Sequence, residues 1–378
     1  MQRFEKFRIN ILISLFIAIV FWGCNSNINS LKIQEKEVAF KVVDNPFKYA
    51  SFSTSNDDYV AFLTDSKVNV YGLNNAVDHY SVNLDFLTSP YLKERYGDVN
   101  SFCFNGRDSL FVLTTNALLF LVNGKAEKIV LINSLSKNEN YKTVRFANLD
   151  RSPIYYDSKS GRIIGRIYCH VCGQTNKSFY EQPQLAGISI QDGSLKIYDV
   201  PFSEIYQENY YGFSNEVNIT NSGQKSIISY SADPNFYIYN RATNALKSIS
   251  AKGNSDNAIP LEISKSGSAE AKIKAMITNP MYTEVRYDKY RKLYYRFLLS
   301  PIPLKSDSGK YNTLENKPLV LTVYNEHFKI AGEFPLDTHY REFISFVTKN
   351  GLYIFYRTEN NANYKFGYFK ILTFENEV

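Results

Sequence analysis

The stretch Asn279–Pro303, NPMYTEVRYDKYRKLYYRFLLSPIP, has the pattern of one β-hairpin. Its halves, Tyr282–Tyr287 and Leu293–Leu299, are rich in the aromatic and aliphatic residues that favour strands. The five polar residues Asp288–Lys292 separate them, which is an ordinary hairpin loop length. Prolines 280, 301 and 303 bound the stretch because proline cannot donate to a sheet ladder. The sequence therefore predicts two antiparallel strands here.

The register of this hairpin follows if Tyr287 pairs with Leu293. Glu284 then opposes Arg296, and Arg286 opposes Tyr294. Both faces carry large side chains, as stacked sheets require. The charged residues Glu284, Arg286 and Arg296 have two interpretations: a polar site that faces a cleft or channel, or a cross-strand ion pair between neighbouring sheets. The ion pair is the more ordinary arrangement of charge inside a sheet protein.

Weaker copies of this pattern recur along the chain. They form six groups of about four strands, which lie within residues 47–84, 99–132, 144–200, 216–251, 279–334 and 343–374. Asn-Gly or Asp-Gly pairs at 123, 192 and 350 are strong hairpin signals. Four-stranded sheets repeated in this way are typical of a β-propeller. The extra strand Val38–Val43 could join the last blade and close the ring, which removes a free sheet edge.

We therefore predict an all-β protein in which residues 31–378 form one six-bladed β-propeller of four-stranded antiparallel blades. Short helices are expected only at 89–96 and 266–276. Segments 202–213, 252–275 and 304–317 are interpreted as loops. Loops on a propeller rim are a common place for ligand contacts.

The N-terminus has the features of a signal peptide. Three basic residues precede an apolar run from Ile9 to Trp22, which is too short to span a bilayer. Gly23-Cys24 follows at once, and this resembles a bacterial lipoprotein signal in which the cysteine is lipidated. Residues 1–23 are then the signal peptide, and residues 24–30 are the lipidated cysteine and a polar tether. The alternatives are an ordinary secretory signal and an N-terminus that is retained in the membrane.

The three other cysteines give fewer indications. Cys103 lies in an apolar strand and is interpreted as a buried thiol. Cys169 and Cys172 form a CxxC pair that could be a structural disulfide, free thiols, half of a metal site or a redox pair. No second CxxC exists to complete a metal site, and the strand context does not fit a thioredoxin motif.

Charge and motifs exclude several classes of function. Residues 1–23 hold three of the 43 Lys and Arg residues and one of the 37 Asp and Glu residues, so the remaining chain has a net charge of +4. The basic residues are scattered, which argues against a nucleic-acid footprint. The chain has neither a G-x-S-x-G motif nor a phosphate-binding G-x-x-x-x-G-K-[ST] motif. Its four histidines lack ligand spacing, so no metal or cofactor is expected.

The leader, the six groups and the stretch Tyr282–Phe297, with its Tyr-Asp-x2-Arg-x2-Tyr-Tyr-Arg-Phe core, resemble an uncharacterised family of Gram-negative lipoproteins. This family is domain of unknown function 4221, which is related to the six-bladed TolB-like propellers. The resemblance implies the propeller fold and a lipid-anchored location. It brings no established activity and no catalytic residues.

Two main functions fit these observations, and a third interpretation is a signalling or sensory lipoprotein whose partner is a membrane protein. The first is a propeller anchored to the outer membrane, periplasm-facing, that binds an envelope protein or a glycan. Its binding residues would be the aromatic cluster Tyr206, Tyr210, Tyr211 and Phe213, together with the charged hairpin residues. The second is an envelope hydrolase or lyase that uses the central channel, since acid–base chemistry needs only two placed carboxylates.

Overall fold

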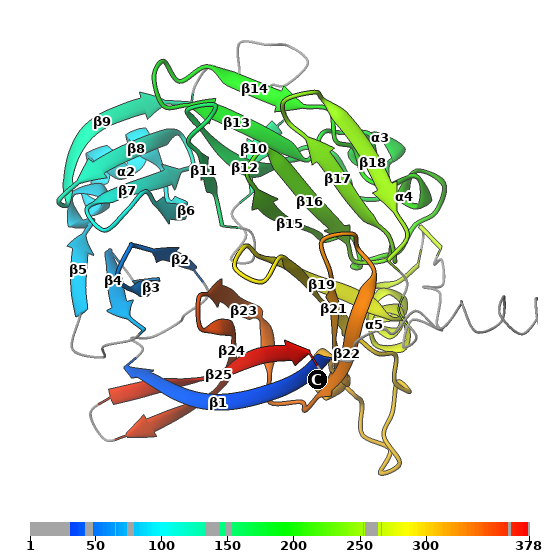
Figure 1. The fold of residues 1–378 in the computed structure, drawn as a ribbon. Coiled ribbons are helices and arrows are strands. Elements are labelled where there is room, and N and C mark those ends of the chain that lie inside the picture. Colours follow the sequence, from blue (N-terminus) through cyan, green and yellow to red (C-terminus); the bar gives the residue numbers. More distant parts are fainter. Residues whose placement is uncertain are drawn as a thin grey trace, which may run out of the picture.

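The computed structural model describes residues 31–41, 48–64, 66–73, 79–132, 144–147, 153–251, 253, 264–265, 267–361 and 364–376. These residues form six antiparallel sheets arranged in a ring (Figure 1). The prediction of a six-bladed propeller is confirmed.

The six blades follow one another in chain order, starting with the sheet that contains β2. Blade one consists of β2 (Tyr49–Ser53), β3 (Asp58–Thr64), β4 (Lys67–Gly72) and β5 (His79–Asn83). Blade two consists of β6 (Val99–Phe104), β7 (Ser109–Thr114), β8 (Ala117–Val122) and β9 (Lys125–Leu131). Blade three consists of β10 (Val144–Phe146), β11 (Tyr155–Asp157), β12 (Arg162–Cys169), β13 (Leu185–Ser189) and β14 (Leu195–Tyr198). Blade three differs from the four-stranded pattern because β10 and β11 pair with different parts of β12.

The other three blades have four strands each. Blade four consists of β15 (Val217–Ser222), β16 (Lys225–Tyr230), β17 (Phe236–Asn240) and β18 (Ala245–Ile249). Blade five consists of β19 (Met281–Asp288), β20 (Leu293–Leu299), β21 (Leu319–Tyr324) and β22 (Ile330–Leu336). Blade six consists of β23 (Arg341–Thr348), β24 (Gly351–Asn361), β25 (Tyr364–Asn376) and β1 (Leu31–Lys41).

The burial of each strand depends on its position within the blade. Most second and third strands are covered on both faces, and all residues of β3 and of β21 are buried. Outer strands such as β9 and β18 are mostly exposed. This explains why the inner strands read as nearly continuous apolar runs, because each of their faces packs against a neighbouring sheet.

A cluster of buried apolar side chains fills each interface between neighbouring blades. Six such clusters join blades one and two, two and three, three and four, four and five, five and six, and six and one. The core is therefore divided among the blade interfaces around the ring. The high aromatic content of the chain supplies the large rings that bury the most area there.

The N-terminal strand closes the ring as predicted. All 11 residues of β1 have register partners on the antiparallel β25, so blade six combines the two ends of the described chain. The observed strand is longer at its N-terminal end than the predicted Val38–Val43, and residues 42 and 43 lie outside the described part. This pairing covers the hydrogen-bonding edge of β25.

The predicted hairpin register is wrong by one residue. Tyr287 pairs with Tyr294 and Asp288 pairs with Leu293, so four residues rather than five form the loop. A bulge between Tyr282 and Val285 shifts the register again. Asp288 extends β19 because its side chain bonds the amides of the following turn, at 2.9 Å from both Tyr290 N and Arg291 N.

The helices are short and lie outside the blades. The two predicted helices are present as α2 (Pro90–Tyr96) and α5 (Ala269–Thr278), each capped by a serine side chain. Two further helices, α3 (Lys177–Tyr180) and α4 (Glu204–Glu208), were not predicted, and α4 lies in the segment 202–213 that was interpreted as a loop. Within the described ranges, no helix is long and apolar enough to cross a membrane.

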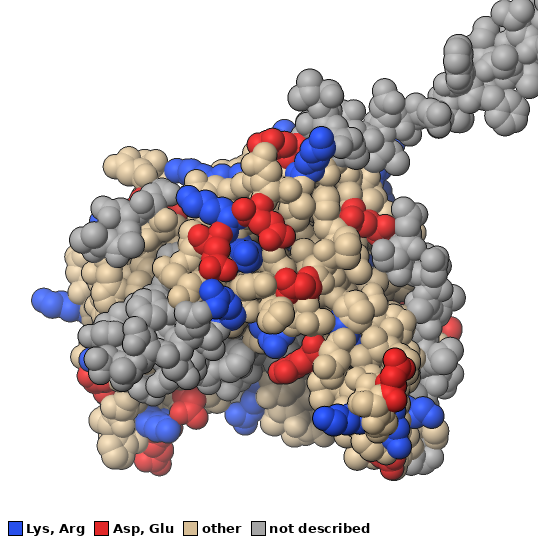
Figure 2. All heavy atoms as spheres, turned by 90° about the horizontal axis from the view of Figure 1, so that it is seen from below, with Lys and Arg blue, Asp and Glu red and all other residues tan. Residues whose placement is uncertain are grey.

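Charge on the outside of the ring is mixed. In a view from the side of blade six, Lys and Arg side chains alternate with Asp and Glu side chains (Figure 2). On β1, for example, Lys32 and Lys36 alternate with Glu35 and Glu37. This visible side offers no extended surface of one sign.

Candidate functional site: the central cavity

The first strands of the six blades surround a central cavity of about 440 Å³. Every blade contributes lining residues, among them Phe52, Phe104, Tyr155, Asn221, Arg286 and Ser345. Most of these residues lie near the carboxyl ends of the first strands, so the cavity occupies the end of the channel from which the first strands lead into the second. Its size falls within the usual range for small-molecule sites.

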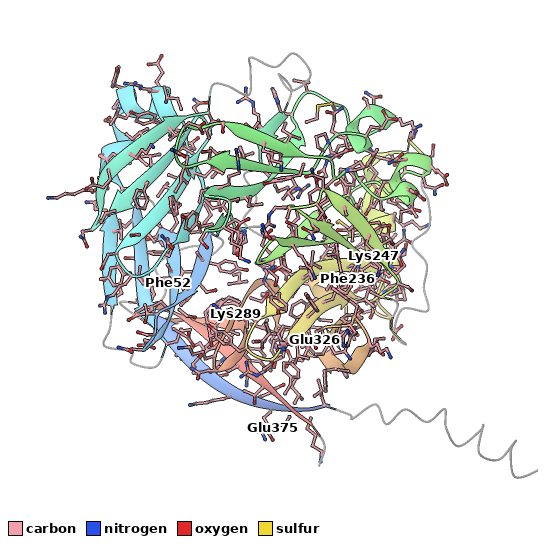
Figure 3. The ribbon with its side chains drawn as sticks, turned by 45° about the horizontal axis from the view of Figure 1, so that its top comes forward. Phe52, Phe236, Lys247, Lys289, Glu326 and Glu375 are labelled. Carbon is pink, nitrogen blue, oxygen red and sulfur yellow. A yellow bond between two sulfur atoms is a disulfide. The ribbon has the colours of Figure 1, made fainter. Side chains whose placement is uncertain are left out.

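The lining combines aromatic rings with uncharged polar groups. Phe52 stacks on Phe104 across the boundary between blades one and two, with ring centroids 4.3 Å apart. Hydroxyl and amide groups come from blades two to four, at Asn105, Ser158 and Thr220. Figure 3 places Phe52 and Lys289 beside the central opening. Rings and hydroxyl-binding groups together suit a polar ligand that also has an apolar face.

Arg286 and Tyr49 join three blades at the wall of this cavity. The Arg286 guanidinium donates from Nε to Ser345 O at 2.8 Å and from Nη2 to Tyr49 Oη at 2.7 Å. Its Nη1 lies 2.6 Å from Glu284 Oε2 and also donates to Val285 O. The Tyr49 hydroxyl in turn donates to Ser345 O at 2.8 Å. Blades one, five and six are thereby held in one arrangement.

Burial and charge act in opposite directions on this group. Desolvation lowers the pKa of Arg286, but the adjacent Glu284 carboxylate and Tyr49 outweigh it and raise that pKa above its ordinary value. Burial raises the pKa of Tyr49, which therefore stays a neutral hydrogen-bonding group. The cavity wall thus keeps a fixed guanidinium at all physiological pH values.

The rim of the cavity is bridged by a tyrosine from blade five. The hydroxyl of Tyr290, in the loop after β19, lies 2.6 Å from the hydroxyl of Ser53, at the end of β2 in blade one. These two blades are not neighbours in the ring, so the bond spans blade six. The exposed Lys289 lines the cavity next to this bridge.

The three charged hairpin residues do not form one site. The predicted pairing of Glu284 with Arg296 is wrong, because the bulge places Val285 opposite Arg296 and Glu284 pairs with Arg286. Arg296 is buried on the other face of β20 and bonds Ser229, Asp233 and Pro234 of blade four. Arg286 alone of the three lines the cavity, and a ligand contact there stays a prediction.

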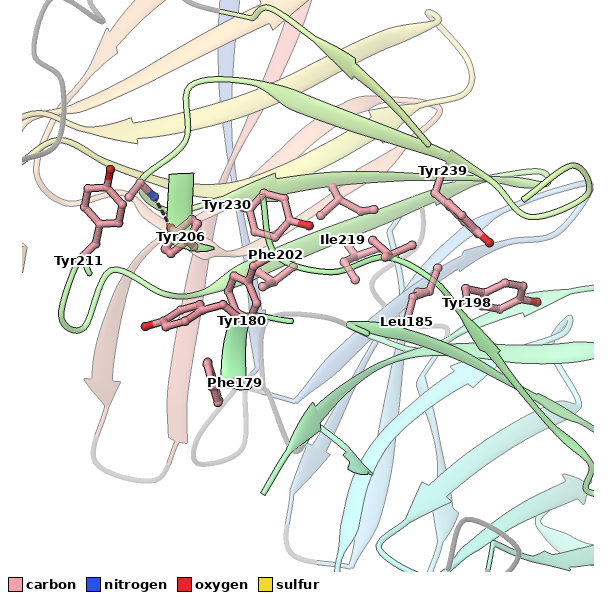
Figure 4. Close-up of a cluster of buried hydrophobic side chains, with 14 of the residues drawn as sticks. Phe179, Tyr180, Leu185, Tyr198, Phe202, Tyr206, Tyr211, Ile219, Tyr230 and Tyr239 are labelled. Atoms are coloured by element: carbon pink, nitrogen blue, oxygen red, sulfur yellow. Dashed lines mark hydrogen bonds between the residues drawn. The ribbon is translucent and has the colours of Figure 1, made fainter. Parts of the chain in front are cut away.

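The predicted aromatic cluster lies in the core. Tyr206, Tyr210 and Tyr211 belong to the cluster between blades three and four, with 2%, 2% and 8% of their surfaces exposed. Figure 4 shows Tyr206 and Tyr211 within this cluster. The Tyr206 hydroxyl donates to Ser214 O at 2.7 Å and accepts from Ala232 N at 2.6 Å. These rings could not contact a ligand at the surface as they lie. Phe213 is 43% exposed and is the one member still open to such a contact.

The CxxC pair is a disulfide. Cys169, at the end of β12, is bonded to Cys172 in the following turn, with Cα atoms 5.4 Å apart. Cys172 packs against the cluster between blades three and four, so the bond fixes this turn onto the core. Cys103 is a free buried thiol as expected, and burial raises its pKa to about 12. No group of three metal-ligating side chains occurs among the residues that the structure describes.

A second cavity of about 230 Å³ lies between blades five and six and is lined by Lys317. The Lys317 ammonium donates to Met276 O at 3.0 Å and to Asn279 O at 2.5 Å, at the end of α5. Burial lowers the pKa of Lys317 to about 8. Since its hydrogen bonds satisfy helix carbonyls, we interpret this lysine as a structural cap.

Sequence reasoning missed most of the cavity. Ser51, Asn105 and Ser158 are small polar residues without a motif, and they come from three separate blades. Their common feature is position, because Asn105 and Ser158 directly follow the ends of β6 and β11, and Ser51 lies two residues before the end of β2. An alignment of the six sequence groups on their first turns would have placed these polar residues at neighbouring positions.

One solved structure shares this fold over most of its length. A crystal structure of a member of the DUF4221 family from Bacteroides vulgatus has a TM-score of 0.72 at 18% identity, and the match covers 92% of this chain and 99% of that chain. A luciferin-regenerating enzyme is more distant, with a TM-score of 0.45 at 9% identity, covering 89% of this chain and 95% of that one. No curated protein matches the chain.

The match to a family model is the most specific of these findings. The model for the domain of unknown function DUF4221 matches residues 96–335, which is more than half of the sequence. The predicted resemblance to this family is confirmed. The chain belongs to the DUF4221 family.

Proposed function

We propose that this protein is a lipid-anchored binding module of the cell envelope, which takes a saccharide in its central cavity. The observation that carries the proposal is the cavity of about 440 Å³, to which all six blades contribute rings, hydroxyls and amides. Such a site holds a ligand on a rigid frame, so little ordering is needed on binding. The anchor is the lipidated Cys24, which lies outside the described residues. We place the protein on the periplasmic side of the outer membrane.

The enzymatic alternative has less support. Acid–base cleavage of a glycan needs two placed carboxylates. Among the described residues that line the cavity, none is Asp or Glu. The buried Glu284 is paired with Arg286, and Asp157 with Arg241. We therefore base the proposal on binding.

The anchor is tested by replacing its cysteine. We expect the wild-type protein to partition with membranes and to carry a lipid mass increment, whereas Cys24→Ala stays unprocessed or soluble. The neighbouring change Asn25→Ala serves as the control and should leave partitioning unchanged. Fractionation and mass spectrometry of the mature protein measure both. A mature wild-type protein without a lipid mass increment, or a Cys24→Ala protein that still carries one, would contradict the anchor.

The binding site is tested by filling the cavity. Ser51 is exposed on β2 and lines the cavity, so Ser51→Trp should occupy the ligand space without removing a core contact. We expect residues 24–378 to bind members of an array of neutral and acidic saccharides. Ser51→Trp should lose about tenfold or more in affinity. Ser55→Trp, exposed in the loop of the same blade, is the matched control.

An array without any retained saccharide would refute the saccharide proposal. Crosslinking in the intact envelope then distinguishes the remaining role: a stoichiometric protein partner would assign the propeller to protein binding instead.

A further inference from the structure

The charged groups of the cavity all lie on one wall. Of the described lining residues, only Arg286 and Lys289 carry a formal charge at neutral pH. Both come from blade five, one from β19 and the other from the loop that follows it. We propose that the ligand is an acidic saccharide whose carboxylate, or an equivalent oxyanion, binds this wall. The inference rests on the proposed function and adds the charge class of the ligand.

Arg286 is prepared to receive an oxyanion. Three of its N–H groups donate hydrogen bonds, to Ser345 O, Val285 O and Tyr49 Oη, and Nη1 also forms an ion pair with Glu284 Oε2. Nη2 carries two hydrogens and donates one to Tyr49, so we infer that a ligand would accept the second. Because the guanidinium is already fixed, a bond to it requires little loss of side-chain freedom. Its charge is balanced by Glu284, so Arg286 supplies direction rather than net charge.

Lys289 supplies the net charge. It is exposed at the rim, and its Nζ lies over the Tyr290 ring at 5.1 Å from the centroid. No carboxylate is within ion-pair distance of Lys289 among the described residues. Its neighbour Lys292, by contrast, lies 3.7 Å from Glu326. A ligand carboxylate could therefore bind Lys289 without displacing an internal partner.

The surrounding loops add to this potential. The loops that connect first and second strands span 54–57, 105–108, 158–161, 223–224, 289–292 and 349–350. Together they hold six Lys or Arg residues and two Asp residues. Arg291 and Lys292 are paired with Asp288 and Glu326, so the other four cations stand against two carboxylates. The acidic residues that end two first strands, Asp157 and Asp288, are buried and paired with Arg241 and Arg291. An anion approaching this end of the channel is therefore attracted.

The other walls suit the remaining parts of a sugar. Asn105, Ser158, Thr220 and Asn221, from blades two to four, offer hydroxyl and amide groups. The Phe52–Phe104 stack offers a ring edge or face for apolar C–H groups. A uronic acid has this combination: one carboxylate, several hydroxyls and an apolar face.

Matched pairs of probes test the charge class. Residues 24–378 are titrated by calorimetry with methyl glucuronide against methyl glucoside, and with methyl galacturonide against methyl galactoside. We expect at least one acid to bind about tenfold or more tightly than its neutral counterpart, as a charge-assisted hydrogen bond allows. Lys289→Gln should remove most of that preference, and added salt should reduce it. Lys292→Gln changes the net charge equally in the same loop and should retain it.

The outcomes separate the two proposals. Equal binding of acids and neutral sugars, or a Lys289→Gln variant that keeps the acid preference, overturns the inference and leaves saccharide binding in place. A site that accepts sugar phosphates but not uronates supports an oxyanion wall and assigns the anion to phosphate. A protein that binds no saccharide of either charge refutes the proposed function and this inference together.

Discussion

Arg296→Met should destabilise the protein by about 3–5 kcal/mol, because it leaves buried polar groups without partners. Arg296 is 1% exposed and donates to Ser229 Oγ at 3.0 Å, to Pro234 O at 2.5 Å and to Asp233 O at 2.6 Å. Its guanidinium carbon also lies 3.8 Å from the centroid of the Tyr282 ring. Two of these acceptors are main-chain carbonyls, which stay in place when the side chain is shortened or made apolar.

Urea unfolding measures this loss, with Arg296→Lys and Arg95→Met as comparisons. Lysine keeps the charge but not the planar guanidinium that reaches three acceptors. Arg296→Lys should therefore show most of the loss in unfolding free energy that is expected for Arg296→Met. Arg95 is exposed on α2, and its change to methionine should stay within about 0.5 kcal/mol of the wild type. An Arg296→Met protein that unfolds at the wild-type urea concentration would show that the three bonds contribute nothing net.

The sequence was sufficient for the architecture because the blades repeat local signals. Apolar strand patterns recur in each group, Asn-Gly or Asp-Gly turns occur in three of the six, and each signal acts within one hairpin. The match of predicted and observed strands, including β1 on the last blade, follows from this locality. A propeller needs few contacts between residues of distant blades, so errors in one hairpin do not spread to the next.

The hairpin of blade five shows which details local sequence signals could not predict. Its register was wrong because Asp288 bonds the amides of its own turn and because a bulge lies between Tyr282 and Val285. Neither feature has a sequence signal strong enough to change a register that is obtained by counting residues outward from the loop. A slip of one residue moves side chains to the opposite face, and it separated Glu284 from its predicted partner Arg296.

The candidate site was least accessible to sequence reasoning. Tyr206 and Tyr210 were predicted as a binding cluster because aromatic residues are dense in this segment. In the structure, α4 and the residues after it place both rings in the interface between blades three and four. The cavity residues are distributed over the whole chain and meet only when the ring closes. A high local density of aromatic residues therefore marked a part of the core, whereas the cavity residues share only their position within the repeated blade.

Removal of β1 should have the second large effect, because it opens the ring. A protein that begins at residue 42 loses the strand that pairs along β25, and with it the contacts of Leu31, Ile33 and Val38 with the clusters that flank blade six. The edge of β25 then exposes a long row of unpaired amides and carbonyls, which promotes pairing with other copies. We expect this protein to aggregate or to unfold at a much lower urea concentration than residues 31–378.

Size-exclusion chromatography and urea unfolding of the two proteins measure this effect, and a peptide of residues 31–41 provides the rescue. The peptide has the sequence LKIQEKEVAFK and should restore a monodisperse elution and raise the urea midpoint of the shortened chain. A peptide with Ile33 and Val38 replaced by aspartate keeps the backbone but not the apolar contacts, so it should fail to rescue. If residues 42–378 alone unfold like the longer chain, the blades are stable without closure and β1 is only a covering strand.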